Sequence, residues 1–174
     1  MRVEDVDKLI SAVEDLRREG LQISLVLVGS IVDVSPPKWV THKYYVKDYL
    51  TYVEDILETS DICVIPYPNT KLHFYYTLPA KFAEYMVAGK PIISTNLKEV
   101  GKYIKAFNCG LVANNREEFK EHIRRLYCNR NLAIELGRNG RRAAEHTFNY
   151  EVVAEEFLNK LIKTLELEEG VSVE

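Results

Sequence analysis

The sequence predicts an α/β fold with a doubly wound parallel sheet, and three observations support this class. Short runs of β-branched apolar residues recur along the chain, and the stretches between them carry apolar residues at helical spacing. The 174 residues are 47% hydrophobic and 28% charged, which is the makeup of a soluble domain large enough to bury a core. We therefore expect a parallel sheet covered by helices on both faces.

The first expected element is a helix at residues 3–18, stopped by Gly20. Its apolar residues recur every three or four positions and form one stripe: Val6, Leu9, Ile10, Val13 and Leu16. Three elements are expected next, namely a strand at 23–28 closed by Gly29, a tyrosine-rich strand at 41–46 and a helix at 48–58.

The second half of the chain continues this alternation. A buried strand at 62–65 ends at Pro66, and an irregular loop is expected at 67–78. Pro79 suits the first turn of a helix that Gly89 stops. The remaining expected elements are strands at 91–94 and 110–113, helices at 116–128, 132–147 and 150–165, and a frayed tail from Glu166.

No repeat, linker or low-complexity segment divides the chain, so residues 1–174 are expected to form a single domain. Its beginning is unusual, because a doubly wound unit normally opens with a strand and Met1 lies almost directly before a helix. Either the first strand is missing or the domain belongs to a longer chain.

Composition also bears on partners and compartment. The net charge of -3 provides no field that would attract nucleic acid, so none is expected as a partner. No apolar run approaches the ~20 residues of a membrane span, and we expect a cytoplasmic protein. The three cysteines lack metal or redox spacing and are expected to be buried thiols: Cys63, Cys109 and Cys128.

Ligands of open parallel sheets bind beyond the carboxyl ends of the strands, where loop amides and helix N-termini converge. In this chain that rule selects four places: Gly29 and Ser30, Val46 and Lys47, 66–70, and 94–96. The segment 77–91, which joins two of these strand ends, is the most informative. With Pro79 in the first helical turn, the amides of 77–80 point at the crevice and Lys81 adds a positive charge, which suits a diphosphate.

Glu84 follows Lys81 by three residues and shares its helix face. Its carboxylate can accept hydrogen bonds from two neighbouring hydroxyls, as on a ribose. Phosphate and sugar recognition would then come from one helix. An ordinary surface ion pair between Lys81 and Glu84 explains the same spacing equally simply.

Four segments together resemble a known family. Residues 78–93, LPAKFAEYMVAGKPII, look like the donor-binding motif in the C-terminal domain of family 4 (group 1) glycosyltransferases of the GT-B fold. Three further segments match in the same order, namely the strand 60–66, the strand 25–29 that ends in glycine, and the aromatic turn 147–150. The resemblance implies the Rossmann-like C-terminal half of a GT-B fold and covers nearly the whole chain.

The resemblance implies a site for a nucleoside-diphosphate sugar. Glu84 would bind the ribose, Lys81 and the backbone at Thr77 and Leu78 would face the phosphates, and backbone near Val46 would border the base. Two other positions belong to the predicted site: Gly29, after the first strand, and Glu99, which matches the Glu after the family's glycine-rich loop. The implied enzyme is a retaining glycosyltransferase that needs no metal and no other cofactor.

Three departures from the family pattern accompany this resemblance. Tyr76 stands where the family has the first Glu of its pair, the glycines before Glu99 are absent, and Arg2 is the only remnant of the family's first phosphate-binding elements. The N-terminal domain that carries the acceptor site also lies outside these residues. We therefore expect this chain alone to be inactive, and the missing domain to be its partner in cis or in trans.

Other interpretations remain open on the sequence. The chain could be a non-catalytic subunit of a split glycosyltransferase that pairs with a separate acceptor-binding chain. An epimerase on the same fold would need an acid and a base, for which only His73 and Glu99 are candidates. His73 lies in the crevice loop, where it would contact the donor or simply face solvent. Basic C-terminal helices leave a membrane-surface role open through a lipid-linked acceptor.

Overall fold

The computed structural model describes residues 3–29 and 35–169, which form helices around two short parallel sheets. In the first sheet β1 (Leu25–Val28) pairs with β2 (Val40–Lys43), and in the second β4 (Ile92–Thr95) lies between β3 (Cys63–Ile65) and β5 (Gly110–Ala113). All pairs are parallel, as predicted. The expected single sheet is nevertheless split, because no strand of one sheet pairs with a strand of the other in the described ranges.

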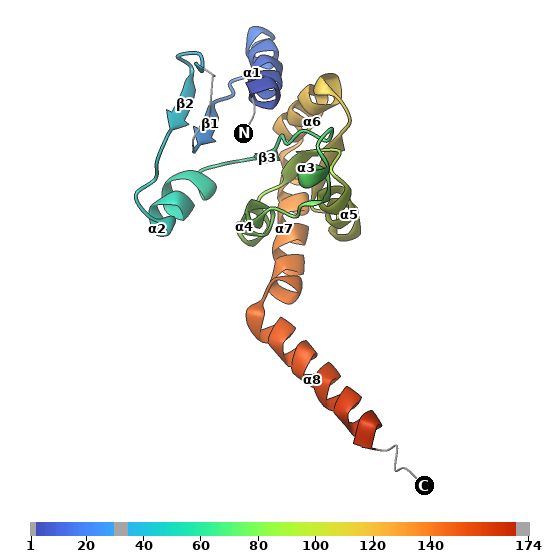
Figure 1. Ribbon diagram of the computed structural model, residues 1–174. Coiled ribbons are helices and arrows are strands. Elements are labelled where there is room, and N and C mark those ends of the chain that lie inside the picture. Colours follow the sequence, from blue (N-terminus) through green and yellow to red (C-terminus); the bar gives the residue numbers. More distant parts are fainter. Residues whose placement is uncertain (1–2, 30–34, 170–174) are drawn as a thin grey trace.

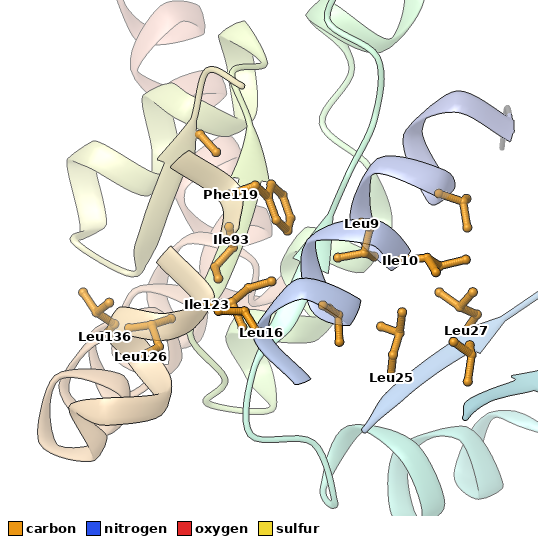
Figure 2. Close-up of a cluster of buried hydrophobic side chains, with 14 residues drawn as sticks. Leu9, Ile10, Leu16, Leu25, Leu27, Ile93, Phe119, Ile123, Leu126 and Leu136 are labelled. Atoms are coloured by element: carbon orange, nitrogen blue, oxygen red, sulfur yellow. The ribbon is translucent and has the colours of Figure 1, made fainter. Parts of the chain in front are cut away.

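The largest core lies beneath α1 (Val3–Arg18) and α6 (Arg116–Cys128). Figure 2 shows the α1 stripe pointing two ways: Ile10 lies toward Leu25 and Leu27 of β1, whereas Leu9 and Leu16 lie toward the side of β4 and α6. These side chains are all buried. One helix therefore joins the cores of both sheets, and burying its stripe contributes on the order of 1.5–3 kcal/mol for each large side chain.

Charged groups fasten α1 to α6 along the rim of this core. The guanidinium of Arg116 donates from Nε to Ser11 Oγ at 2.8 Å and also pairs with Asp15. Glu19 accepts from Lys120 at 3.0 Å and from Arg124 at 2.5 Å. These contacts, Arg124 first, lower the pKa of Glu19 from 4.5 to about 2.

A second core is built by α4 (Ala80–Val87), α5 (Lys98–Phe107) and α7 (Arg130–Thr147). Phe82 and Met86 of α4 are fully buried in it. Helix α7 approaches very closely, because a Cβ on Gly137 would lie 2.0 Å from the carbonyl oxygen of Gly89. Only glycine fits at this contact, and it fixes α7 against the turn that follows α4.

Helix α8 (Tyr150–Glu169) extends away from the two cores (Figure 1). Its apolar side chains recur at helical spacing and are exposed, including Phe157 at 64% and Leu161 at 44%. The others are Tyr150, Val153, Leu158, Ile162 and Leu165. None of the helices in the described part of the chain is both long and apolar enough to cross a bilayer.

Several sequence expectations about local structure are corrected. The loop 67–78 contains a short helix, α3 (Leu72–Tyr76), and α5 was not expected at all. The predicted helix 48–58 is split into α2 (Tyr49–Tyr52) and a π-helix, η1 (Val53–Leu57), in which the amide of Glu58 donates to the carbonyl of Val53 at 2.9 Å. Helix α8 continues to Glu169 instead of fraying at 166.

Two predictions about single residues also need correction. Pro79 is not in the first turn of α4 but caps it in extended backbone, with φ of -73° and ψ of 144°, so the helix begins at Ala80. Cys63 and Cys109 are buried thiols as expected, whereas Cys128 at the end of α6 is exposed. Its position on the solvent face of an amphipathic helix explains the difference.

Candidate functional site

A cavity of about 300 Å³ opens at the carboxyl ends of β3, β4 and β5. This is the edge at which ligands of open parallel sheets bind. Two loops, the end of one strand and two helices form its walls: Pro66, Tyr67, Pro68 and Asn69 after β3, Asn114 and Asn115 after β5, Thr95 of β4, Lys8 and Leu9 of α1, and Arg116 and Phe119 of α6. Its lining combines aromatic and proline surfaces with amide, hydroxyl and cationic groups.

Hydrogen bonds hold the loops around this cavity in place. Thr95 Oγ1 donates to the carbonyl of Tyr67 at 2.5 Å and ties the β3 loop to β4. Asn96 Nδ2 donates to Asn114 Oδ1 at 2.9 Å and ties β4 to β5. Glu118 accepts from the backbone and side-chain amides of Asn114, which lowers the pKa of this carboxyl. The rim is therefore held in place by hydrogen bonds within the protein itself.

Helix α4 places Lys81 beside the cavity. The amino group of Lys81 lies 5.0 Å from the centroid of the Tyr67 ring, and that ring forms part of the cavity wall. The amide of Phe82 donates to the carbonyl of Pro79 at 2.8 Å. The amides of Ala80 and Lys81, which precede it in the helix, have no partner within the helix and can donate to a ligand. A cation and a helix N-terminus thus occur together.

Glu84 is half-buried on the same helix, one turn further on. The alternative that Lys81 and Glu84 form a surface ion pair is wrong, because neither makes an ion pair in the ranges 3–29 and 35–169. Tyr52 of α2 and Tyr85 of α4 lie close to the carboxylate of Glu84. Burial raises the pKa of both phenols, and the charge of Glu84 raises them further.

Three other residues that were predicted to contact the sugar donor make contacts within the protein. Thr77 donates its hydroxyl to the carbonyl of His73 and its amide to the carbonyl of Phe74, so it closes α3 and is not the open donor that the sequence suggested. Leu78 packs its side chain against the second core. His73 is exposed on α3, with its ring 4.9 Å from that of Phe74.

The three remaining predicted residues are spread along the carboxyl edges. Gly29 follows β1 with φ of 102°, donates its amide to Lys43 and accepts from Nε2 of His42 at 2.8 Å. Val46 is half-buried in the loop after β2, and Glu99 lies in the first turn of α5. No hydrogen bond or ion pair joins His73 to Glu99 among the described residues, so the structure shows no pairing of the epimerase acid with its base.

None of the eight predicted site residues forms a wall of the cavity, although Lys81 reaches it through Tyr67. Sequence reasoning selected the segments 66–70 and 94–96, of which residues 66–69 and Thr95 line the cavity, and it missed Lys8, Asn114, Asn115 and Arg116. The asparagines could have been found, because they follow the strand 110–113 directly. Lys8 and Arg116 carried no signal, since their place depends on how α1 packs on α6.

Two other positions singled out from the sequence, Arg2 and Ser30, lie outside the described residues. Metal-binding side chains do not gather in the part of the chain that is described: it holds no group of three or more His, Cys, Asp or Glu residues placed to bind an ion. The carboxylates Asp15 and Glu19 are instead held by arginine and lysine side chains.

Comparison with solved structures supports the fold. The chain is similar to sucrose-phosphate synthase (tll1590) from Thermosynechococcus elongatus, with a TM-score of 0.70 and 20% identity over 94% of this chain and 43% of that one. It is also similar to WaaG, a glycosyltransferase involved in lipopolysaccharide biosynthesis, with a TM-score of 0.61 and 21% identity over 87% of this chain and 42% of that one. The chain therefore spans less than half the length of either structure.

Sequence comparison gives the family. No curated protein sequence matches the chain significantly. The profile described as glycosyl transferases group 1 matches residues 1–129, which is most of the chain. That stretch contains both sheets, the cavity and helix α4 with Lys81 and Glu84. With the GT-B likeness of the fold, this match identifies the chain as a member of the group 1 glycosyl transferases.

Proposed function

We propose that this chain binds the nucleoside-diphosphate sugar donor of a glycosyltransferase. The observation that carries the proposal is the state of Lys81 and Glu84, which share a helix at the carboxyl edge of the sheet and make no ion pair within the described ranges. A cation and a carboxylate in partly buried positions are less well solvated than exposed ones, and no ion pair within the described ranges compensates for that loss. A ligand with a diphosphate and a vicinal diol would satisfy both.

In this proposal the diphosphate lies at the N-terminus of α4, near Lys81 and the amides of Ala80 and Lys81. The helix dipole and the lysine charge favour an anion there. The ribose hydroxyls donate to Glu84. Backbone near Val46 and Gly29 borders the base, and Glu99 and His73 lie toward the sugar.

The same groups would assist transfer by stabilising the diphosphate as it leaves. The bond from the anomeric carbon to the diphosphate oxygen breaks, and a bond from that carbon to an acceptor hydroxyl forms. Positive charge placed where negative charge develops lowers the barrier of such a step. The family resemblance implies that the anomeric configuration is retained without a metal ion. An N-terminal GT-B domain, in cis or in trans, would bind the acceptor and supply the group that takes its proton.

The decisive experiment is a thermal-shift and calorimetric titration of the chain with UDP, GDP, ADP and CMP. A ligand that binds only the folded state raises the melting temperature. One nucleotide should bind, and Glu84→Ala should weaken its binding by about 1–3 kcal/mol, the usual effect of losing hydrogen bonds to a charged group. Lys81→Ala should weaken the binding of a nucleoside diphosphate more than the binding of the matching nucleoside.

Two variants serve as matched controls for charge. Lys105→Ala on α5 and Glu135→Ala on α7 remove the same charges at exposed positions on other helices. Both should bind nucleotide like the unmodified chain. If no nucleotide binds at millimolar concentration, or if Glu84→Ala binds normally, the donor-site proposal is wrong.

A second function has support from α8. The exposed apolar side chains of that helix are the feature that the split-glycosyltransferase interpretation requires, since contiguous apolar surface marks a protein interface. In this form the chain docks on an acceptor-binding polypeptide through α8. Replacing Phe157 and Leu161 with Ser should leave the melting temperature of the isolated chain unchanged and should abolish docking on a co-expressed GT-B N-terminal domain.

A further inference from the structure

The cavity at the carboxyl ends of β3, β4 and β5 borders the place that we propose for the diphosphate. Tyr67 belongs to the cavity wall, and the amino group of Lys81 lies 5.0 Å from the centroid of the Tyr67 ring. A ligand whose phosphates lie at Lys81 can therefore extend past Tyr67 into the cavity. The cavity volume of about 300 Å³ is at the lower end for small-molecule sites, so it suits one sugar ring rather than a whole nucleotide.

The wall offers apolar surface to such a ring. Tyr67 and Phe119 supply aromatic faces, and Pro66, Pro68 and Leu9 add aliphatic surface. Figure 2 shows Leu9 on the side of α1 that is turned toward α6, the helix that carries Phe119. Burial of the C–H faces of a sugar against these side chains is favourable, while its hydroxyls still need polar partners.

Polar side chains of the wall differ in whether the protein itself already binds them. Those that are bound, each followed by its partners, are Thr95 by the carbonyl of Tyr67, Asn114 and Asn115 by Glu118, and Arg116 by Ser11, Asp15 and Glu117. In contrast, the ammonium of Lys8 and the side-chain amide of Asn69 make no hydrogen bond or ion pair within residues 3–29 and 35–169. These two groups are therefore open to a ligand.

The charges of the wall favour an anionic ligand. Lys8 and Arg116 are cationic, and none of the wall residues that the structure describes is Asp or Glu. Asp15 and Glu117 pair with Arg116 from outside the wall, so most of the guanidinium charge is compensated. Lys8 pairs with no carboxylate in the described ranges. A carboxylate on the sugar would meet its opposite charge at Lys8.

A relay of two hydrogen bonds fixes the turn of α1 that carries Lys8. Arg116 Nε donates to Ser11 Oγ at 2.8 Å, and Ser11 Oγ donates to the carbonyl of Lys8 at 3.3 Å. The same guanidinium donates from Nη2 to the carbonyl of Ser11 at 3.1 Å. Leu9, the residue after Lys8, is 3% exposed and packs in the largest core. The backbone at Lys8 is thus held in place, and a ligand needs to order only the lysine side chain.

We propose that this cavity binds the sugar of the donor and that the sugar carries a carboxylate, which pairs with Lys8. The inference rests on the donor function proposed above and names the class of donor, a nucleoside-diphosphate sugar acid. The ring lies between Tyr67 and Phe119, and the amide of Asn69 donates to one of its hydroxyls. Lys8 is a specificity-determining residue, because a neutral sugar leaves its ammonium unpaired.

The test is a calorimetric titration with ligands that differ only at carbon 6 of the sugar. One pair is UDP-glucuronic acid and UDP-glucose. The other pair is glucuronic acid 1-phosphate and glucose 1-phosphate, which carry no base and make the result independent of the preferred nucleotide. The acid of each pair should bind about fivefold or more tightly than the neutral sugar. Lys8→Gln should remove this preference and leave the affinity for the neutral sugar unchanged.

Two further variants make the outcome specific. Lys105→Gln, at an exposed position outside the cavity wall, is the matched control and should keep the preference for the acid. Asn69→Trp fills the cavity from an exposed loop position and should weaken the binding of both sugar acids, while a nucleoside diphosphate binds as before. The melting temperature checks that each variant folds.

The possible results separate this proposal from the donor function itself. Equal affinities within both pairs, or a preference for the acid that survives Lys8→Gln, overturn the sugar acid and leave the donor function intact. The same holds if a nucleoside diphosphate binds but neither sugar acid does. Unchanged binding of the sugar acids to Asn69→Trp overturns the place of the sugar in the cavity. If no nucleoside diphosphate binds either, both proposals are wrong.

Discussion

The amino group of Lys81 lies 5.0 Å from the centroid of the Tyr67 ring, which brings the proposed phosphate site and the cavity wall into contact. Tyr67 belongs to the loop after β3, whereas Lys81 lies in the first turn of α4. The ring holds the cation by attraction to its negative face while leaving the ammonium donors open to a ligand. The two residues are therefore expected to act together in binding an anion.

Replacing Tyr67 with Leu should weaken binding of a nucleoside diphosphate two- to fivefold, because a cation–π contact of this kind contributes about 0.5–1 kcal/mol. Tyr67→Phe keeps the ring and should bind like the unmodified chain. Calorimetric titration of the two variants measures the difference, with the melting temperature as a check that both fold. Equal affinities for Leu and Phe variants would show that the ring does not position Lys81.

Acid should destabilise the fold through Glu19. Its pKa in the folded chain is about 2, lowered mainly by the hydrogen bond from Arg124, against 4.5 for the ordinary group. A lowered pKa means that the stabilisation is present above pH 4.5 and is lost as the pH falls toward 2. The melting temperature should therefore fall in that window, and Glu19→Gln should make the decline shallower. An unchanged pH profile in the Gln variant would contradict this assignment.

Two helical glycines should respond to alanine in opposite ways. A Cβ at Gly137 would lie 2.0 Å from the carbonyl oxygen of Gly89, so Gly137→Ala should cost about 1–3 kcal/mol of unfolding free energy or more. The nearest atom to a Cβ at Gly101 is 3.8 Å away, and Gly101→Ala should gain about 0.5–1 kcal/mol from helix propensity. Urea denaturation of both variants compares them. Equal stabilities would show that α7 is free to move away from the turn.

Thiol reactivity should separate the three cysteines. Burial raises the pKa of Cys63 to about 12 and that of Cys109 to about 11, whereas Cys128 is exposed. Because the thiolate is the reacting species, one thiol per native chain should react quickly with a disulfide reagent at pH 8. The other two should react only after denaturation. Cys128→Ser should abolish the fast reaction, and a remaining fast thiol would mean that one of the cores opens readily.

Local features of the fold were predictable because local sequence determines them. The strand Gly110–Ala113 and the helix Arg116–Cys128 lie where apolar spacing placed them, and Asn115 caps the helix by accepting from the amide of Glu118. The strand at 41–46 was displaced to Val40–Lys43, because the tyrosines after it are exposed. The division into two sheets was not predictable, since strand pairing is decided by contacts between distant segments.

The candidate site divides in the same way. Lys81 and Glu84 were identified because both lie on one short helix and three residues apart, a relation that sequence expresses directly. The partners of Lys81 and Glu84 were not identified. Tyr67 reaches Lys81 from another loop, and Tyr52 reaches Glu84 from α2, so both contacts depend on the packing of elements that no local pattern reports.

The π-turn η1 sets the rotational phase of the polypeptide between α2 and β3. An ordinary helix turns by about 100° per residue, and a π-turn inserts one extra residue into the helix. Tyr52 before the turn faces Glu84 and Tyr85, while Ile56 and Leu57 within it are buried. If η1 were shortened by one residue, Ile56 and Leu57 could stay buried only if Tyr52 rotated away from the carboxylate of Glu84. The five residues of η1 thereby link the burial of Ile56 and Leu57 to the position of Tyr52 beside Glu84.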